Sequence, residues 1–301
     1  MNIRMQYGAK PKELTYSKWD IGFYGMQVDD RGEQAISFIK ENSSDHYDFE
    51  YISTNFTIQT NEEVIIIDDI DEYFKKFKPQ QKVIMDCSTL GVVEMLIIIQ
   101  SMFNNGIRTF DALYIEPISY KNSKGKIVQK RNFELSSEFD GYIGIPGHTL
   151  YLSTKGNDKF AFFCGYESER IERAFEDLNI NCKKCQLFFG LPAFHTGWEL
   201  NTYSNNIRVI ENRNIENTFY YCGASNPMSV CEKLQLIYNG LGEDENLFLV
   251  PVGTKPMALG ACIFKVSTND NNRIAFLYDH PKKTKNRSSE VARWNLYNIK
   301  I

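Results

Sequence analysis

Two patterns of apolar and polar positions alternate along this chain. Short apolar runs typical of buried strands precede segments with the three- to four-residue spacing of amphipathic helices. The predicted strands cover residues 19–26, 49–53, 64–68, 82–86, 110–116, 159–164, 185–189, 207–210, 218–222, 246–252 and 273–278. The predicted helices cover residues 31–41, 69–77, 90–103, 167–178, 227–239 and 256–266. This alternation predicts an α/β fold in which largely parallel sheets carry flanking helices.

Two segments interrupt the alternation. Residues 1–18 are polar and irregular and are expected to be a frayed lead-in. Residues 121–131 hold five basic residues and no acid, which indicates an exposed basic connector that leads into a small hairpin. The sequence therefore predicts an N-terminal Rossmann-like half (1–120), a connector with a hairpin (121–157) and a C-terminal Rossmann-like half (158–301).

The tail of the chain is strongly basic. Residues 282–301 contain six Lys or Arg residues and one acid, Glu290. We interpret the tail as a solvated terminal helix, with a surface that seats phosphates or RNA as the alternative.

A strand-turn-helix-strand unit occurs twice, at residues 84–117 and 249–281. Thr89 and Thr254, in the two turns, precede a Tyr-x-x-Pro sequence by 25 and 24 residues respectively. This agreement predicts an internal repeat of two Rossmann-like halves. Few residues are identical between the copies, so chance similarity of two ordinary α/β units remains the alternative.

The composition is that of an ordinary soluble globular protein, with 43% hydrophobic and 24% charged residues. The formal charge of -4 argues against a protein whose whole surface wraps nucleic acid. The longest strongly apolar runs, 64–67 and 95–99, are far shorter than the ~20 residues of a membrane span, so no membrane partner is expected. The seven cysteines lie mostly in apolar segments, which favours reduced thiols and a cytoplasmic location. Cys182 and Cys185 have the spacing of half a zinc site, but a second pair is missing, and neither a metal nor a cofactor is expected.

Turns of small and polar residues end most of the predicted strands. In a parallel sheet these turns share the carboxyl edge, where the helices that follow present unpaired N–H groups to an anion. We therefore predict that nine residues of these turns bind a ligand: Ser88, Thr89, Gly165, Tyr166, Ser225, Asn226, Gly253, Thr254 and Lys255. The alternative is that these residue types end strands and cap helices in any α/β protein.

The sharpest of these turns is Gly253-Thr254-Lys255-Pro256. A lysine at the start of a helix places a positive charge beside backbone donors, as a phosphate site requires. The turn is not a P-loop, because position 248 is Phe where the Walker pattern needs Gly. A solvated lysine at a helix start is the alternative for Lys255.

Four acids lie at strand ends, Asp86, Glu116, Glu167 and Asp279, and are candidates for general acid or base catalysis or for contacts to a ribose hydroxyl. Asp86 and Glu167 are the two that a hydrolase would use for catalysis. Each is equally compatible with a structural role as an acid near a helix N-terminus or as a surface charge.

The repeated unit, with Asp-Cys-Ser-Thr at 86–89 and Gly-Thr-Lys-Pro-Met at 253–257, resembles the CARF and SAVED sensor domains of prokaryotic antiviral systems. The resemblance covers residues 82–117 and 246–281. In that family the strand-end loops bind cyclic oligonucleotides, which implies such a role for Ser88, Thr89, Thr254 and Lys255. No nuclease or protease effector domain is recognisable in the 301 residues, so the resemblance implies a separate effector protein as partner.

Three functions follow from these observations. The first is a protein that binds a nucleotide or another phosphate-bearing ligand, as a sensor or regulatory subunit in antiviral defence. The second is a nucleotide-processing hydrolase that uses Asp86 or Glu167. The third is a protein-interaction subunit without a small-molecule ligand. The sequence leaves open whether the chain forms a homo-oligomer.

Overall fold

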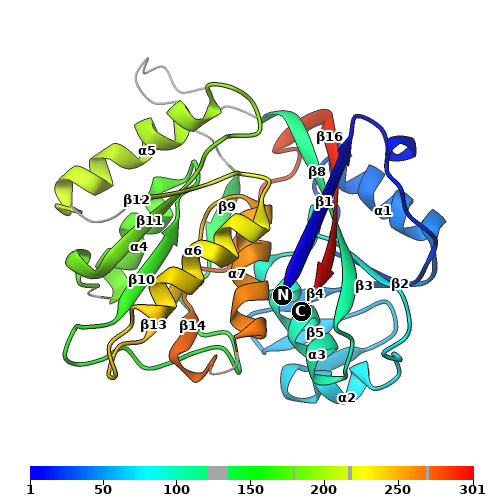
Figure 1. Ribbon diagram of the computed structural model, residues 1–301, viewed down its shortest axis with the longest axis horizontal. Helices are drawn as coiled ribbons and strands as arrows, with labels where there is room; N and C mark the ends of the chain where they lie inside the picture. The colour runs from blue at the N-terminus through cyan, green and yellow to red at the C-terminus, as the bar shows by residue number, and fades with distance from the viewer. Residues whose placement is uncertain (121–134, 179, 216–218, 269–270) are drawn as a thin grey trace. The chain divides into compact units, whose positions relative to one another are not determined.

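The computed structural model of the protein describes residues 1–120, 135–178, 180–215, 219–268 and 271–301 (Figure 1). The chain divides into two compact units, Met1–Lys121 with Lys283–Ile301, and Asn122–Lys282. Residues 283–301, which the sequence placed with the C-terminal half, thus return to the first unit. The predicted connector at 121–134 lies outside the described residues.

The first unit contains a six-stranded mixed sheet in the order β1-β16-β8-β7-β2-β3. Its strands are β1 (Asn2–Gly8), β2 (Trp19–Tyr24), β3 (Ser43–Asp48), β7 (Val83–Asp86), β8 (Thr109–Tyr120) and β16 (Ser288–Lys300). Strands β3, β2, β7 and β8 are parallel, whereas β16 runs antiparallel to both β8 and β1. The parallel half of this sheet is the part that the alternation of strands and helices predicted.

The parallel strands of the first unit are joined by helices. Helix α1 (Asp30–Asn42) connects β2 to β3, and α3 (Val92–Asn104) connects β7 to β8. Between β3 and β7 lie a small antiparallel sheet and a short helix, formed by β4 (Glu50–Ile52), β5 (Thr57–Gln59), β6 (Val64–Ile66), η2 (Ile67–Asp69) and α2 (Ile70–Phe74). A single turn, η1 (Pro11–Glu13), precedes β2. The core beneath α1 joins its residues Ala35 and Phe38 to Ile84 of β7, Leu113 of β8 and Trp294 of β16.

Two predictions for the first unit are wrong, and a third is confirmed only in part. The expected lead-in at 1–18 contains strand β1, and the tail expected to be a helix is strand β16. These two strands pair with each other from opposite ends of the chain, so no local pattern could reveal their partner. The segment 64–68, expected to be a buried strand, contains the three-residue strand β6, whose Val64 and Ile66 are more than half exposed.

The second unit contains a five-stranded sheet in the order β12-β11-β10-β13-β14, and every pair in it is parallel. Its strands are β10 (Lys159–Phe163), β11 (Cys185–Gly190), β12 (Phe219–Cys222), β13 (Leu247–Pro251) and β14 (Ile274–Phe276). Four helices connect them in turn: α4 (Ser168–Leu178), α5 (Trp198–Asn212), α6 (Pro227–Asn239) and α7 (Lys255–Ser267). The remaining described elements are β9 (Ser136–Phe139), β15 (Pro281–Lys283), η3 (Cys182–Lys184) and η4 (Asn271–Arg273).

The predicted strand at 207–210 is wrong, because these residues belong to α5. Ile207, Val209 and Ile210 are β-branched residues that favour a strand, and the polar residues before them give no clear apolar stripe of a helix. Tertiary packing decides the outcome, since Val209 is buried in the core and Tyr203 stacks on Phe189 of β11.

The helices of the second unit form two groups. Residues of α4 and α5, such as Ile171 and Val209, share a core with one face of the sheet, formed by side chains such as Phe162 and Phe189. Helices α6 and α7 pack closely on each other: a Cβ on Gly260 of α7 would lie 2.5 Å from Pro227 O of α6, and Cys231 Sγ donates to the Gly260 carbonyl oxygen at 3.1 Å. None of the described helices is both long and apolar enough to cross a bilayer.

Helix α7 buries a lysine, which gives a first testable prediction. Lys265 is only 5% exposed, and burial lowers its pKa to about 8. Lys265→Met should therefore raise the free energy of unfolding at pH 7 by about 1–2 kcal/mol, because the variant buries no charge. Between pH 8 and 10 the unfolded wild-type chain binds more protons than the folded one, so wild-type stability rises with pH and the difference shrinks.

Urea denaturation of both proteins at pH 7 and pH 10 measures this difference. The exposed Lys183 supplies the control, since Lys183→Met should change stability little at either pH. A Lys265→Met variant that is less stable than wild type at pH 7 contradicts the prediction.

Candidate functional site

In the second unit, the turns that follow four neighbouring strands touch one another. A Cβ atom on Gly165, after β10, would lie 2.3 Å from the carbonyl oxygen of Val252, after β13. The Thr254 hydroxyl donates to the Ala224 carbonyl oxygen at 2.6 Å, and the Ala224 N–H donates to Pro192 O at 2.9 Å. The turns after β10, β11, β12 and β13 therefore form one continuous polar edge of the sheet.

The order of the strands reverses between β10 and β13. From β10 the chain moves outward to β11 and β12, then returns to the other side of β10 to form β13 and β14. Because such crossovers are right-handed, the helices that follow β10 and β13 leave the sheet on opposite faces, and this reversal is the position where ligands bind in open parallel sheets. Gly165 and Tyr166 lie on one side of this reversal, and residues 253–255 lie on the other.

The turn at 253–255 is shaped by the start of α7. Thr254 is the N-cap of this helix, and its hydroxyl accepts a hydrogen bond from Met257 N at 3.4 Å. Gly253 packs against Phe163, where an added Cβ would lie 3.2 Å from the Phe163 Cβ. Lys255, half-buried, is the first residue of the helix, so its charge lies at the positive end of the helix dipole.

The turn after β12 has a clear structural role. Asn226 is exposed, and its side chain caps α6 by accepting a hydrogen bond from Ser229 N at 3.1 Å. Ser225 is half-buried beside it. Their neighbour Ala224 contacts Thr254, which links this turn to the start of α7.

Glu167 is occupied by bonds within its own unit. Its carboxylate accepts hydrogen bonds from Leu135 N at 3.2 Å, from Ser136 N at 2.8 Å and from the Ser136 hydroxyl at 3.0 Å. It also lies 3.7 Å from the Arg170 guanidinium. This geometry favours the structural interpretation of Glu167, as the anchor of the segment that begins β9.

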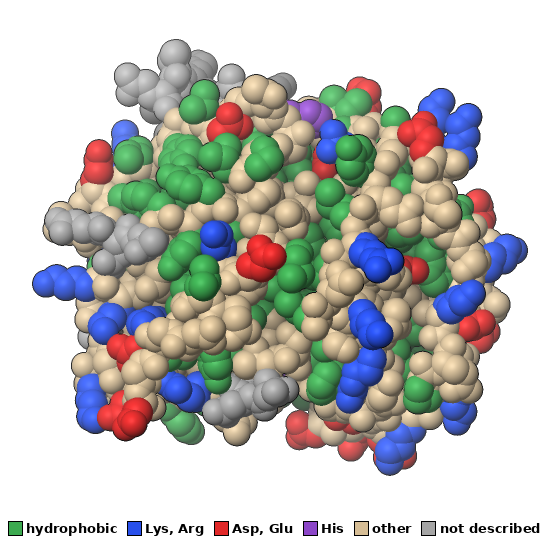
Figure 2. Space-filling model, viewed as in Figure 1, with side chains coloured by type: hydrophobic (Ala, Val, Ile, Leu, Met, Phe, Trp, Pro, Cys, Tyr) green, Lys and Arg blue, Asp and Glu red, His purple; other side chains and the backbone are tan. Residues whose placement is uncertain are grey.

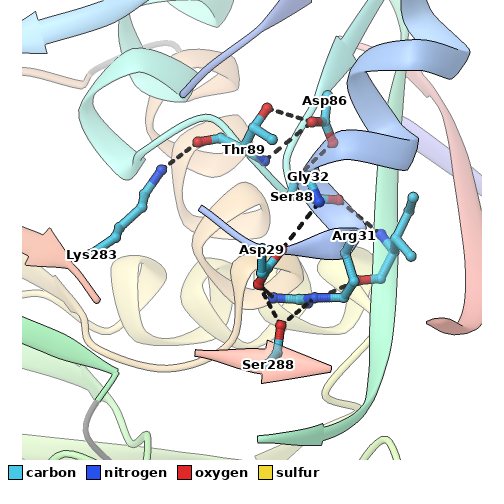
Figure 3. A network of polar contacts seen from close by, with 9 residues as sticks. Asp29, Arg31, Gly32, Asp86, Ser88, Thr89, Lys283 and Ser288 are labelled. Carbon is cyan, nitrogen blue, oxygen red and sulfur yellow. Dashed lines mark hydrogen bonds and ion pairs between the residues drawn. The ribbon is translucent and has the colours of Figure 1, made fainter. Parts of the chain in front are cut away.

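In the first unit, Asp86 organises the turn that follows β7 (Figure 3). One carboxylate oxygen accepts from Ser88 N at 2.8 Å, and the other accepts from Thr89 N at 3.2 Å and from the Thr89 hydroxyl. Burial raises the pKa of Asp86, and the hydrogen bonds from Thr89 and Ser88 oppose that rise. Asp86 thus holds its own turn together.

The two hydroxyl groups of this turn point into the protein. The Ser88 hydroxyl accepts from Ile115 N at 3.0 Å, which ties the turn to β8. The Thr89 hydroxyl accepts from Gly25 N at 2.9 Å, which ties it to the loop after β2. Both side chains are buried, so the structural alternative is favoured for Ser88 and Thr89 as well.

Sequence reasoning missed a buried ion pair beside this turn. Arg31 donates from NH2 to Asp29 at 2.8 Å, from Nε to the Ser288 hydroxyl at 2.8 Å and from NH1 to Ile115 O at 3.0 Å. Burial acts to raise the pKa of Asp29, but the Arg31 charge and the hydrogen bonds outweigh it and hold that pKa below its ordinary value. Asp29 directly precedes helix α1, so a search for N-caps could have found it, whereas Ser288 lies more than 250 residues away.

The structure groups the predicted residues by unit. In the second unit, Gly165 touches Gly253 where the strand order reverses, Thr254 is bonded to the turn that carries Ser225 and Asn226, and Tyr166 and Lys255 are the next residues of these two turns. Asp86, Ser88 and Thr89 belong to the first unit. Among the described parts of the chain, no three His, Cys, Asp or Glu residues gather where they could hold a metal ion.

Searches against protein-family models, curated proteins and solved structures return no match for this chain.

Proposed function

We propose that the protein binds a nucleotide, and that its second unit holds the phosphate-bearing part of this ligand at the carboxyl edge between β10 and β13. The observation that carries the proposal is the reversal of the strand order β12-β11-β10-β13-β14 at this point. This order matches the first five strands of the doubly wound dinucleotide-binding fold, in which ligands bind at the reversal. On this proposal the second unit is Rossmann-like, and the parallel half of the first unit is its partial repeat.

The residues at the reversal have the chemistry that such a ligand needs. The first turn of α7 presents the positive end of the helix dipole, and Lys255 adds a positive charge there. Gly253 has no side chain to keep a phosphate away from the backbone. On the opposite side, Tyr166 is half-buried with its ring 6.4 Å from that of Trp198, and it supplies an aromatic surface for a base.

Binding without turnover is the form of this proposal that the geometry favours. The oxygens of Asp86 accept bonds from residues 88 and 89, and those of Glu167 from residues 135 and 136. A general base must reach the proton that it abstracts, and these carboxylates are committed elsewhere. The resemblance to CARF and SAVED domains extends the proposal to a sensor in antiviral defence that binds a cyclic oligonucleotide and acts through a separate effector protein.

Lys255→Gln tests the proposed site. Loss of one charge-assisted contact to phosphate should weaken nucleotide binding about tenfold or more. The measurement is isothermal titration calorimetry with mononucleotides and cyclic oligonucleotides, preceded by a thermal-shift screen of the same compounds. Chromatography of the mixtures after incubation reveals any product, which the hydrolase alternative requires.

The matched control is Lys183→Gln. Lys183 is an exposed lysine of the same unit, and it lies on η3, just before the amino end of β11. It should leave nucleotide affinity unchanged. The proposal fails if no nucleotide binds the wild-type protein, or if Lys255→Gln binds as tightly as wild type.

A second candidate function, a protein-interaction subunit, is favoured by apolar side chains around the edge strand β12. Five large hydrophobic residues there are at least 38% exposed, namely Leu191, Leu200, Ile207, Phe219 and Tyr221. Hydrophobic side chains also gather over the α5 and β12 region in Figure 2. Exposed apolar groups of this kind mark interaction surfaces, and an interaction subunit would bind a protein partner without any nucleotide.

A further inference from the structure

Residues 283–288 fold over the carboxyl ends of β2 and β7 in the first unit. The Lys283 ammonium donates to Thr89 O in the turn after β7, and Asn286 N donates to Val28 O in the loop after β2 at 2.7 Å. The Ser288 hydroxyl donates to Asp29 (Figure 3). This segment, which we call the basic strap, thus bonds to both loops.

The basic strap covers a second reversal of strand order. Strand β2 pairs with β3 on one side and with β7 on the other, and β8 follows β7. The chain moves from β2 to β3 and returns to form β7 and β8 on the opposite side, so β2 and β7 flank the position where ligands bind in open parallel sheets.

Two buried polar atoms of the strap lack partners. Arg287 Nε and the Thr284 hydroxyl are both buried without a hydrogen bond to any of the residues that the structure describes. Arg31 differs, because all three of its donor positions are bonded. Buried donors in native proteins are nearly always paired, so these two atoms indicate a missing acceptor.

The electrostatics around the strap favour an anion as that acceptor. Burial and the nearby charge of Arg31 lower the pKa of Arg287, and burial lowers the pKa of Lys283 to about 8. These shifts mean that the strap's cations are desolvated and close to another cation.

Two of the acids near these cations, Asp29 and Asp86, are engaged by other groups. Glu94 is engaged at one oxygen, and Glu50 also lies near Lys283. Asp29 is bonded to Arg31, Gly32 and Ser288, and Asp86 to residues 88 and 89. Glu94, the acid with the largest effect on Lys283, accepts a hydrogen bond from Tyr51 N at 3.3 Å.

We propose that the first unit contains its own anion site, in which Arg287, Lys283 and Thr284 hold a phosphate group at the reversal between β2 and β7. This site is separate from the one proposed in the second unit and does not depend on it. Its ligand is inorganic phosphate or the phosphate monoester of a small molecule.

Arg287→Gln tests the anion site. All variants are made both in the wild-type protein and in Lys255→Gln, so that the second unit's site is weakened in one of the two series. Thermal unfolding is followed against sodium phosphate and against adenosine 5′-monophosphate, with sodium chloride at matched ionic strength. At least one of the two phosphate compounds should stabilise the parent protein in both series, and Arg287→Gln should weaken the apparent affinity about tenfold or more.

Lys285→Gln is the matched control. Lys285 is an exposed residue of the same strap with the same charge, and its loss should leave the response to phosphate unchanged. Thr284→Val, which removes an unpartnered hydroxyl and no charge, should also weaken binding, and it keeps the test decisive if Arg287→Gln does not fold. A response to adenosine 5′-monophosphate but not to phosphate identifies a monoester, and equal responses identify the free anion.

The proposal is overturned by any of three results. The first is that neither phosphate compound stabilises the Lys255→Gln protein. The second is that Arg287→Gln and Thr284→Val respond to phosphate as their parent does. The third is that Lys285→Gln loses as much of the response as Arg287→Gln. A loss of nucleotide binding through Lys255→Gln with the phosphate response intact would separate the two sites.

Discussion

Replacing Arg170 by methionine is expected to destabilise the second unit by about 3–5 kcal/mol. Arg170 donates from Nε and NH2 to the two oxygens of Asp279 at 2.8 and 2.6 Å, and both side chains are more than 90% buried. The variant leaves the Asp279 carboxylate buried without its bidentate partner. Urea denaturation at pH 7 measures the loss of unfolding free energy.

An exposed ion pair of the same unit supplies the control. Lys155 and Asp244 lie 3.0 Å apart with both side chains at least 70% exposed, so Lys155→Met should cost less than about 1 kcal/mol. Adding Asp279→Asn to Arg170→Met should recover part of the stability, because a neutral amide is cheaper to bury than a carboxylate. If Arg170→Met costs no more than Lys155→Met, the pair does not stabilise the fold as the geometry indicates.

The acids at strand ends show why residue type alone does not reveal a catalytic site. Asp86 binds the N–H groups of its own turn, Glu116 accepts from Asn295 at 3.0 Å, and Asp279 pairs with Arg170. In an α/β unit the turn after a buried strand contains donors that must be satisfied away from water. A carboxylate there serves this need as readily as it serves catalysis, and only the bonding partners separate the two.

The fold of the second unit could largely be predicted from the sequence. Its strands β10 and β13 are buried on both faces and form continuous apolar runs, and helices such as α4 have a clear apolar stripe. The first unit was harder to predict because β1 and β16 depend on each other across the whole chain. Most of β1 is exposed or half-exposed, so its pattern did not distinguish it from a loop.

The residues of the two candidate sites also differ in how far local sequence patterns could predict them. Turn chemistry nominated Gly165 and Lys255, because each follows a predicted strand within a few residues. Arg287 could be recognised only as part of a basic tail, since its position beside Arg31 depends on the pairing of β16 with β8. Local patterns thus place the ends of strands, whereas long-range pairing decides which charges meet them.

Gly165→Ala is expected to destabilise the second unit by about 3 kcal/mol or more, because the added Cβ would lie 2.3 Å from Val252 O. Neither side of this contact can move easily, because the strands that lead into the two turns are paired with each other. Phe163 at the end of β10 pairs with Pro251 at the end of β13. The loops must therefore separate, which should also weaken nucleotide binding at the proposed site. Thermal unfolding and calorimetry with the nucleotide that binds wild type measure the two effects.

Gly240→Ala is the control for the loss of glycine itself. Gly240 has a φ of -96°, and an added Cβ would lie 3.6 Å from its nearest neighbours, so this change should alter stability by less than about 0.5 kcal/mol. The same contact occurs in the first unit, where a Cβ on Gly25 would lie 2.7 Å from Thr89 O. If the glycine after β2, like the glycine after β10, lets two loops meet at a reversal, Gly25→Ala should destabilise the first unit in the same way. A mild effect of Gly165→Ala, close to that of Gly240→Ala, would mean that the two loops adjust independently and that their close approach does not shape the site.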